Sequence, residues 1–77
     1  MRGHGAVVVG ATVQEAVISA VYLEINARIL TQALSFGESP RILSDCEVEL
    51  ARKTQFSPLG LDRAWEYFCR RAGVNVI

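Results

Sequence analysis

Apolar residues in this chain fall into one short unbroken run and several longer periodic stretches. The run is AVVVG, residues 6–10, which is rich in β-branched side chains and closes on a glycine. An apolar run of this length and composition predicts a strand that is covered on both faces, as in a sheet with helices on each side. The pattern therefore favours an α/β fold in which the chain enters through a buried strand.

The next stretch predicts one long helix of about 24 residues, between Thr12 and Gly37. Thr12 and Glu15 have the spacing of a capping box, and Gly37 is a natural left-handed stop. Apolar residues lie on two faces of this helix, and the alanines of the first face allow another element to approach closely. The first face comprises Ala16, Ala20, Leu23, Ala27, Leu30 and Leu34, and the second comprises Ile18, Tyr22, Ile25 and Ile29. A helix that is apolar on two sides is buried on two sides, which so short a chain can hardly achieve alone, so we expect self-association through residues 13–36.

Two further helices are expected in the second half of the chain. Ser44 and Glu47 form another capping box, in front of the stretch DCEVELARKT. FSPLG is expected to be a turn, and LDRAWEYFCRRAG a helix that begins near Asp62 and ends before Gly73. VNVI is expected to be a tail or a short strand. The pattern as a whole predicts one or two strands and three helices.

Length and charge narrow the partners that we expect. The chain has 77 residues, of which 51% are hydrophobic, and its formal net charge is zero. One domain of this size buries only about 60% of its unfolded surface, so an apolar excess favours a partner chain. The balanced charge argues against nucleic acid. Gln14 and Glu15 interrupt the longest apolar stretch before it reaches the roughly 18 residues of a membrane span.

Cysteine usage and the first residues favour a cytoplasmic protein. Cys46 and Cys69 are far apart and form no C-x-x-C pair, so two reduced thiols are the plain interpretation. Arg2 is followed by a glycine-flanked histidine and not by the apolar segment of a secretory signal.

His4 is the strongest candidate for chemistry, because it is the only histidine and lies between two glycines. Flanking glycines let the backbone turn tightly and let an ion approach, and imidazole is a common metal ligand. The plain alternative is an exposed histidine near a terminus. A catalytic zinc needs three protein ligands, and the chain has no H-x-H, no H-E-x-x-H and no cysteine pair with ligand spacing. His4 is therefore interpreted as one ligand of a site whose other ligands lie elsewhere.

The stretch MRGHGAVVVGATVQEAVISAVYLEINARILTQAL resembles the C-terminal part of the class II aldolase/adducin family. Members of that family have a histidine–glycine turn, a valine-rich strand ending in glycine, and a long helix with a YLE and an NAR-like stretch. The resemblance runs from Arg2 to about Leu34, and the LS at residues 43–44 continues it. DRAWEYF, residues 62–68, and the RGHG form of the turn resemble the metal-dependent decarboxylase branch more than the sugar-phosphate aldolases, in which NHG is more usual.

This resemblance implies a fold, a site and an assembly. The fold would be a three-layer α/β/α sandwich, of which residues 1–77 are the C-terminal portion, with the N-terminal part of the domain missing. The family holds a divalent metal with an H-x-H pair and a later histidine, and His4 matches only the latter. The implied metal is zinc, or alternatively manganese, and the implied activity is carbon–carbon lyase chemistry, by decarboxylation or aldol cleavage, on a small hydroxy acid, oxo acid or sugar phosphate. The implied assembly is a homotetramer.

A second class of function stays open beside the enzyme. The chain could be a non-catalytic, adducin-like interaction module, or an inactive truncated remnant of the family. A histidine in this turn favours the enzyme, because a module without a metal has no need of it.

Polar residues on the long helix have structural interpretations as well as functional ones. Glu24 is expected to pair with Arg28 four residues on, as an ordinary helix ion pair, although it could instead bond across a subunit contact. Asn26 is expected to form a structural hydrogen bond.

Aromatic and basic residues gather in the last predicted helix. Trp65, Tyr67 and Phe68 are expected to pack in a core or an interface, with substrate lining as the alternative. Arg70 and Arg71 suit the C-terminal end of a helix, where cations complement the dipole, although arginine also recognises substrate carboxylates.

Overall fold

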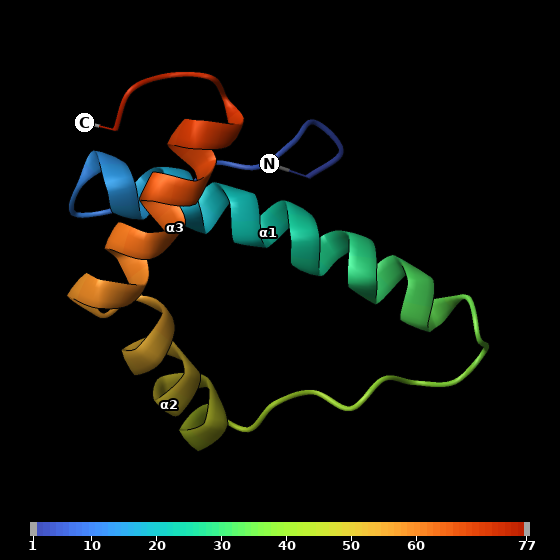
Figure 1. The fold of residues 1–77 in the computed structure, drawn as a ribbon. Coiled ribbons are helices and arrows are strands. Elements are labelled where there is room, and N and C mark those ends of the chain that lie inside the picture. The colour runs from blue at the N-terminus through green and yellow to red at the C-terminus, as the bar shows by residue number, and fades with distance from the viewer. Residues whose placement is uncertain (1, 77) are drawn as a thin grey trace.

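The computed structural model describes residues 2–76, and these residues form three helices joined by irregular segments (Figure 1). α1 spans Val13–Leu34, α2 spans Asp45–Gln55 and α3 spans Pro58–Arg71. α3 packs against both other helices. It crosses α1 near the N-terminal end of that helix, and the other end of α1 projects away from it (Figure 1).

The predicted α/β sandwich is wrong for this chain, because residues 2–76 contain helices and no strand. Residues 6–10, expected as a buried strand, are irregular, and the side chains of Val7 and Val9 are 72% and 81% exposed. A strand needs a neighbour that pairs with its N–H and C=O groups. The described chain offers no such neighbour, so the β-branched run has nothing to pair with. Residues 74–76, a candidate second strand, are irregular as well.

The starts of α1 and α2 confirm Thr12 and Ser44 as N-caps, although the predicted capping box is complete only at α2. The Thr12 hydroxyl accepts the Glu15 N–H at 3.1 Å. At α2 the capping box is reciprocal: the Ser44 hydroxyl accepts the Glu47 N–H at 3.2 Å, and the Ser44 N–H donates to the Glu47 carboxylate at 3.0 Å. Gly37 adopts a φ of +82° just beyond α1, as a left-handed stop requires. α1 ends two residues before the predicted Phe36.

α3 begins earlier than the sequence pattern predicts. Ser57 caps it by accepting the Gly60 N–H at 3.1 Å, and Pro58 occupies the first turn, so the expected turn FSPLG is largely helix. Proline suits this position because its missing N–H has no partner in a first turn. A Cβ on Gly60 would lie 2.6 Å from the Thr54 carbonyl oxygen, so glycine allows the tight corner between α2 and α3.

Few side chains are fully enclosed in this arrangement. Ile18 of α1 is completely buried and Cys69 of α3 is 6% exposed, and these two are the buried hydrophobic residues of the described chain. The Tyr22 ring meets the Phe56 ring edge-on, with centroids 6.4 Å apart, and so links α1 to the end of α2. The contact between α1 and α3 around Ile18 is therefore the centre of the fold.

The chain is more open than its length requires. Its radius of gyration is 14.6 Å, whereas a compact chain of this length has about 11.5 Å. Its accessible surface is 6726 Å², whereas a compact monomer of this size exposes about 4,700 Å². No helix within residues 2–76 combines the length and apolarity that crossing a membrane requires.

The α2 capping box predicts an acid-sensitive helix. The hydrogen bonds from the Ser44 N–H and hydroxyl lower the pKa of Glu47. A carboxylate whose pKa is lower in the folded state than in the unfolded state stabilises the fold at any pH above its unfolded pKa. This stabilisation is lost as the pH falls through the pKa of the folded state. We expect helicity measured by circular dichroism to fall below about pH 4, and the loss to shrink in Glu47→Gln. Glu49→Gln, on the same helix, is the control and should keep the wild-type profile; identical profiles for all three proteins would contradict the prediction.

Candidate functional site

His4 lies on an exposed turn that two glycines hold. Residues 2–4 form the turn, and Gly3 and Gly5 have φ values of +75° and +137°. Side chains other than hydrogen rarely adopt such angles, so both positions need glycine. The tight turn expected from the flanking glycines is confirmed, and the imidazole of His4 is exposed to solvent.

Gly10 fixes the path from this turn to α1. A Cβ at Gly10 would lie 2.7 Å from the backbone nitrogen of Ala16. Gly10 therefore lies directly against the first turn of α1, where a larger side chain has no room.

Metal-ligating side chains do not gather around His4 within the described residues. Residues 2–76 contain no group of three His, Cys, Asp or Glu side chains that could hold a metal ion. Cys46 and Cys69 are both free, the first exposed and the second buried, in keeping with the two reduced thiols expected. A catalytic zinc takes three protein ligands. The residues present therefore do not fit a complete metal centre, and His4 is at most one ligand of it.

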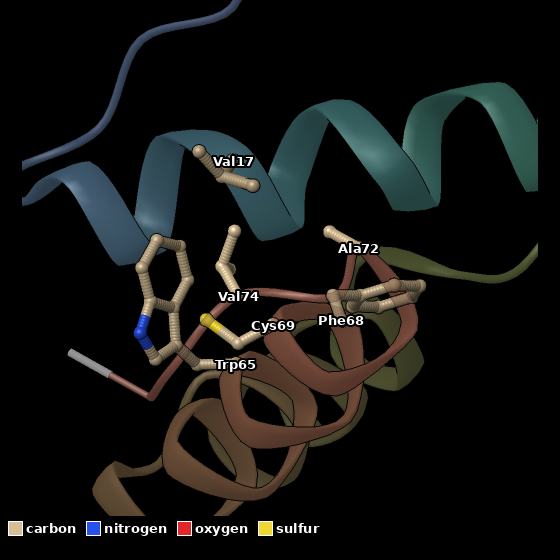
Figure 2. A pocket seen from close by; sticks show the side chains of 6 residues that line it. All are labelled: Val17, Trp65, Phe68, Cys69, Ala72 and Val74. Carbon is tan, nitrogen blue, oxygen red and sulfur yellow. The ribbon is translucent and has the colours of Figure 1, made fainter.

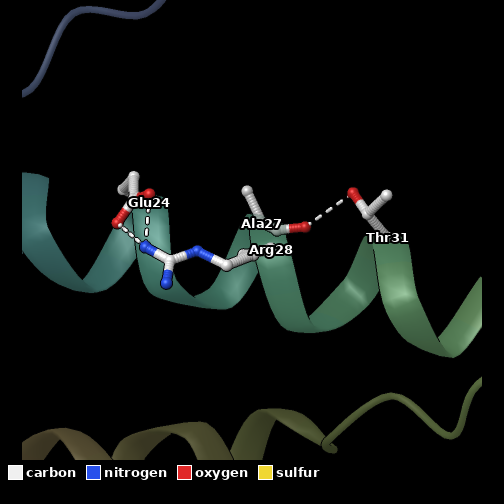
Figure 3. A network of polar contacts seen from close by, with 4 residues as sticks. All are labelled: Glu24, Ala27, Arg28 and Thr31. Atoms are coloured by element: carbon white, nitrogen blue, oxygen red, sulfur yellow. Dashed lines mark hydrogen bonds and ion pairs between the residues drawn. The ribbon is translucent and has the colours of Figure 1, made fainter.

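The polar residues of α1 have the structural role that the sequence predicts (Figure 3). One Arg28 nitrogen donates to both carboxylate oxygens of Glu24, at 2.5 and 2.6 Å. This hydrogen bond, more than the charge attraction, raises the pKa of Arg28. The Asn26 amide donates to the Tyr22 carbonyl oxygen at 2.9 Å, one turn earlier. These bonds are satisfied within one exposed helix, so none of them builds a substrate site.

An apolar pocket of about 220 Å³ lies between α1 and α3 (Figure 2). Trp65 and Phe68 of α3 line it opposite Val17 of α1, an arrangement that fits both the packing role expected of these aromatic residues and the alternative of lining a site. The Phe68 ring also meets the Tyr67 ring edge-on, and Tyr67 itself is 57% exposed. The remaining lining residues are Cys69, Ala72 and Val74.

Sequence reasoning missed the end of α3 as a wall of this pocket. The N–H of Val74 donates to the Cys69 carbonyl oxygen at 3.0 Å, and Gly73 has a φ of +77°, which turns the chain back over the helix end. This arrangement is a Schellman-type stop, in which an apolar residue after the glycine packs on the last turn. The order glycine then valine is the signal that could have revealed it. Arg70 is engaged by Glu66 at 2.6 Å, as a helix ion pair.

No protein-family model, no curated protein and no solved structure matches this chain. The turn at His4 and the exposed apolar surfaces are the features of this chain that bear on its function.

Proposed function

We propose that this chain is part of a divalent-metal-dependent carbon–carbon lyase and that it contributes His4 as one metal ligand. The observation that carries the proposal is an exposed imidazole on a turn that two positive-φ glycines hold, inside the RGHG stretch that resembles class II aldolases and related decarboxylases. Neutral imidazole is a common ligand of zinc, the metal favoured here, and of other divalent ions, with manganese as the alternative.

The other ligands come, in this proposal, from polypeptide outside residues 2–76. The proposed substrate is a small hydroxy acid, oxo acid or sugar phosphate, and the proposed assembly is a homo-oligomer. Support for an assembly comes from the large exposed side chains on every helix, such as Leu34, Leu50 and Leu59, which are 55%, 65% and 62% exposed. Apolar patches of this kind are typical of surfaces that another polypeptide covers.

A non-catalytic interaction module is the second candidate. It is favoured by the same exposed apolar side chains together with the lack of a metal-binding group within the described residues. The two candidates differ in one respect that can be measured, since only the enzyme loses its activity when His4 or the metal is removed.

The test uses the product of the natural gene, expressed with its flanking sequence retained, so that any further ligands are present. Carbon–carbon cleavage is assayed over a panel of hydroxy acids, oxo acids and sugar phosphates, before and after chelation and with zinc or manganese returned. We expect activity that the chelator removes, and a loss of at least about 100-fold in His4→Ala, because loss of one of three ligands weakens the site steeply. Arg41→Ala, an exposed loop change, is the matched control.

Two results would count against the lyase. Turnover that is unchanged in His4→Ala would remove this residue from the site. Absence of cleavage on every substrate class, in a protein that is folded and metal-loaded, would favour the interaction module instead.

A further inference from the structure

We propose that α1 pairs with α1 of a second copy, in antiparallel orientation, through the first apolar face of the helix. This face, the α1 seam, consists of Ala16, Ala20, Leu23, Ala27, Leu30 and Leu34. The proposal deepens the self-association included in the proposed function by naming its surface and geometry, and it does not depend on metal binding at His4.

The seam is free to receive a partner. Ile18, at the contact with α3, lies roughly opposite the seam around the helix, since each residue turns it by about 100°. Leu23, Leu30 and Leu34 are 48%, 48% and 55% exposed, although they are large and apolar. Ala20 and Ala27 are exposed as well, and Ala16 is half-buried. α1 is thus packed on one side and bare on the other.

The spacing of the seam is that of a coiled coil. Its members alternate steps of four and three residues without a break, which is the heptad repeat that brings two helices together along their length. The seam covers about 27 Å of helix at 1.5 Å per residue. The C-terminal part of α1 projects away from α3 (Figure 1), and in the N-terminal part the seam lies opposite the buried Ile18, so a second helix can lie beside the seam.

The sizes of the seam residues select the orientation and the partner. If two copies run antiparallel with residue 25 at the two-fold axis, every layer joins one alanine to one leucine. The layers are Ala16 with Leu34, Ala20 with Leu30, and Leu23 with Ala27, each formed twice. Large residues opposite small ones allow the layers to interdigitate. Parallel pairing in register would instead place alanine opposite alanine, which leaves voids, and leucine opposite leucine, which makes the neighbouring layers wide.

Charges beside the seam do not oppose this pairing. The flanking positions are Val17, Glu24 and Thr31 on one side and Ser19, Asn26 and Ala33 on the other. Glu24 is the one charged residue among them and would lie near its counterpart close to the axis. Its carboxylate is already held by Arg28 of the same helix, which offsets the repulsion.

The available surface is also of the right size. The chain exposes about 2,000 Å² more than a compact monomer of its length, whereas a stable interface takes only about 600 to 1,000 Å² from each partner. A seam of six small and medium residues lies at the lower end of that range, where association is typically weak and reversible. We therefore expect a dimer that forms at micromolar concentrations.

Sedimentation of the apo chain in a chelator tests the proposal. We expect a monomer–dimer equilibrium, which Leu30→Glu weakens by more than about tenfold because it places a charge in an apolar layer. Ile29→Glu is the matched control: Ile29 is 56% exposed, adjacent in sequence and on the opposite face, and its variant should associate like wild type. A protein that stays monomeric at about 200 µM, far above the expected micromolar range, would overturn the proposal, as would association that Leu30→Glu leaves intact.

Cross-linking decides the orientation. Ala20→Cys and Leu30→Cys are prepared separately with Cys46→Ser, mixed in equal amounts and oxidised with diamide, and the joined peptides are mapped. Antiparallel pairing predicts mainly disulfides between residues 20 and 30 of different copies. Disulfides between identical positions would show parallel pairing and contradict the proposal. Because neither measurement uses metal or substrate, their failure is distinct from failure of the lyase.

Discussion

Replacing Ile18 with alanine is expected to abolish the packed structure of the chain. Ile18 is the one side chain of the described residues that is completely buried, and it belongs to α1, which packs against α3. An Ile→Ala change in a core lowers the free energy of unfolding by about 2–5 kcal/mol, because transfer free energy is lost and a cavity is left behind. A chain of this length has a total stability of only about 4–12 kcal/mol, and one with so small a core belongs at the low end. Thermal unfolding followed by circular dichroism should lose its cooperative transition.

Ile29→Ala provides the control for this change. It removes the same atoms from the same helix, at a side chain that is 56% exposed, so the midpoint should move little. If Ile18→Ala unfolds at the temperature of the wild type, the contact between α1 and α3 is not the centre of the fold.

The 77-residue chain alone is expected to show no lyase turnover and no tight zinc binding. One imidazole cannot form the three-ligand geometry of a catalytic zinc. The acidic residues do not replace the missing ligands: Glu24 is held by Arg28 and Glu47 by the α2 capping box. The purified chain is assayed for decarboxylation and retro-aldol cleavage with zinc or manganese added. Turnover that depends on both the metal and His4 would contradict this expectation and show that the chain completes a site by itself.

Local signals in the sequence predicted the helices well. The capping pairs at Thr12 and Ser44 and the glycines at positions 37 and 73 fix helix ends through bonds between neighbouring residues. Such bonds need no knowledge of the rest of the fold. The start of α3 was predicted too late, because Ser57 followed by Pro58 is compatible with a turn as well as with a cap and first helical residue.

The strand was predicted wrongly because strand formation depends on a pairing partner that the residues of the run themselves do not reveal. An unbroken apolar run such as residues 6–10 indicates a tendency to be buried, whereas a strand also requires a partner that completes its hydrogen bonds. No part of residues 2–76 provides that partner. The turn at His4 was predicted from its glycines, because their backbone angles are a local property. The ligands that would surround the histidine are not a local property, and residues 2–76 contain no group that could supply them.

The central claim is that His4 is one ligand of a metal site completed by polypeptide beyond the described residues. Its most direct test is the metal content of the natural gene product, purified without added metal and measured by mass spectrometry for wild type, His4→Ala and Arg41→Ala. We predict about one divalent ion per chain in wild type and Arg41→Ala, and almost none in His4→Ala. Equal metal in all three proteins, or none in any of them, would contradict the claim.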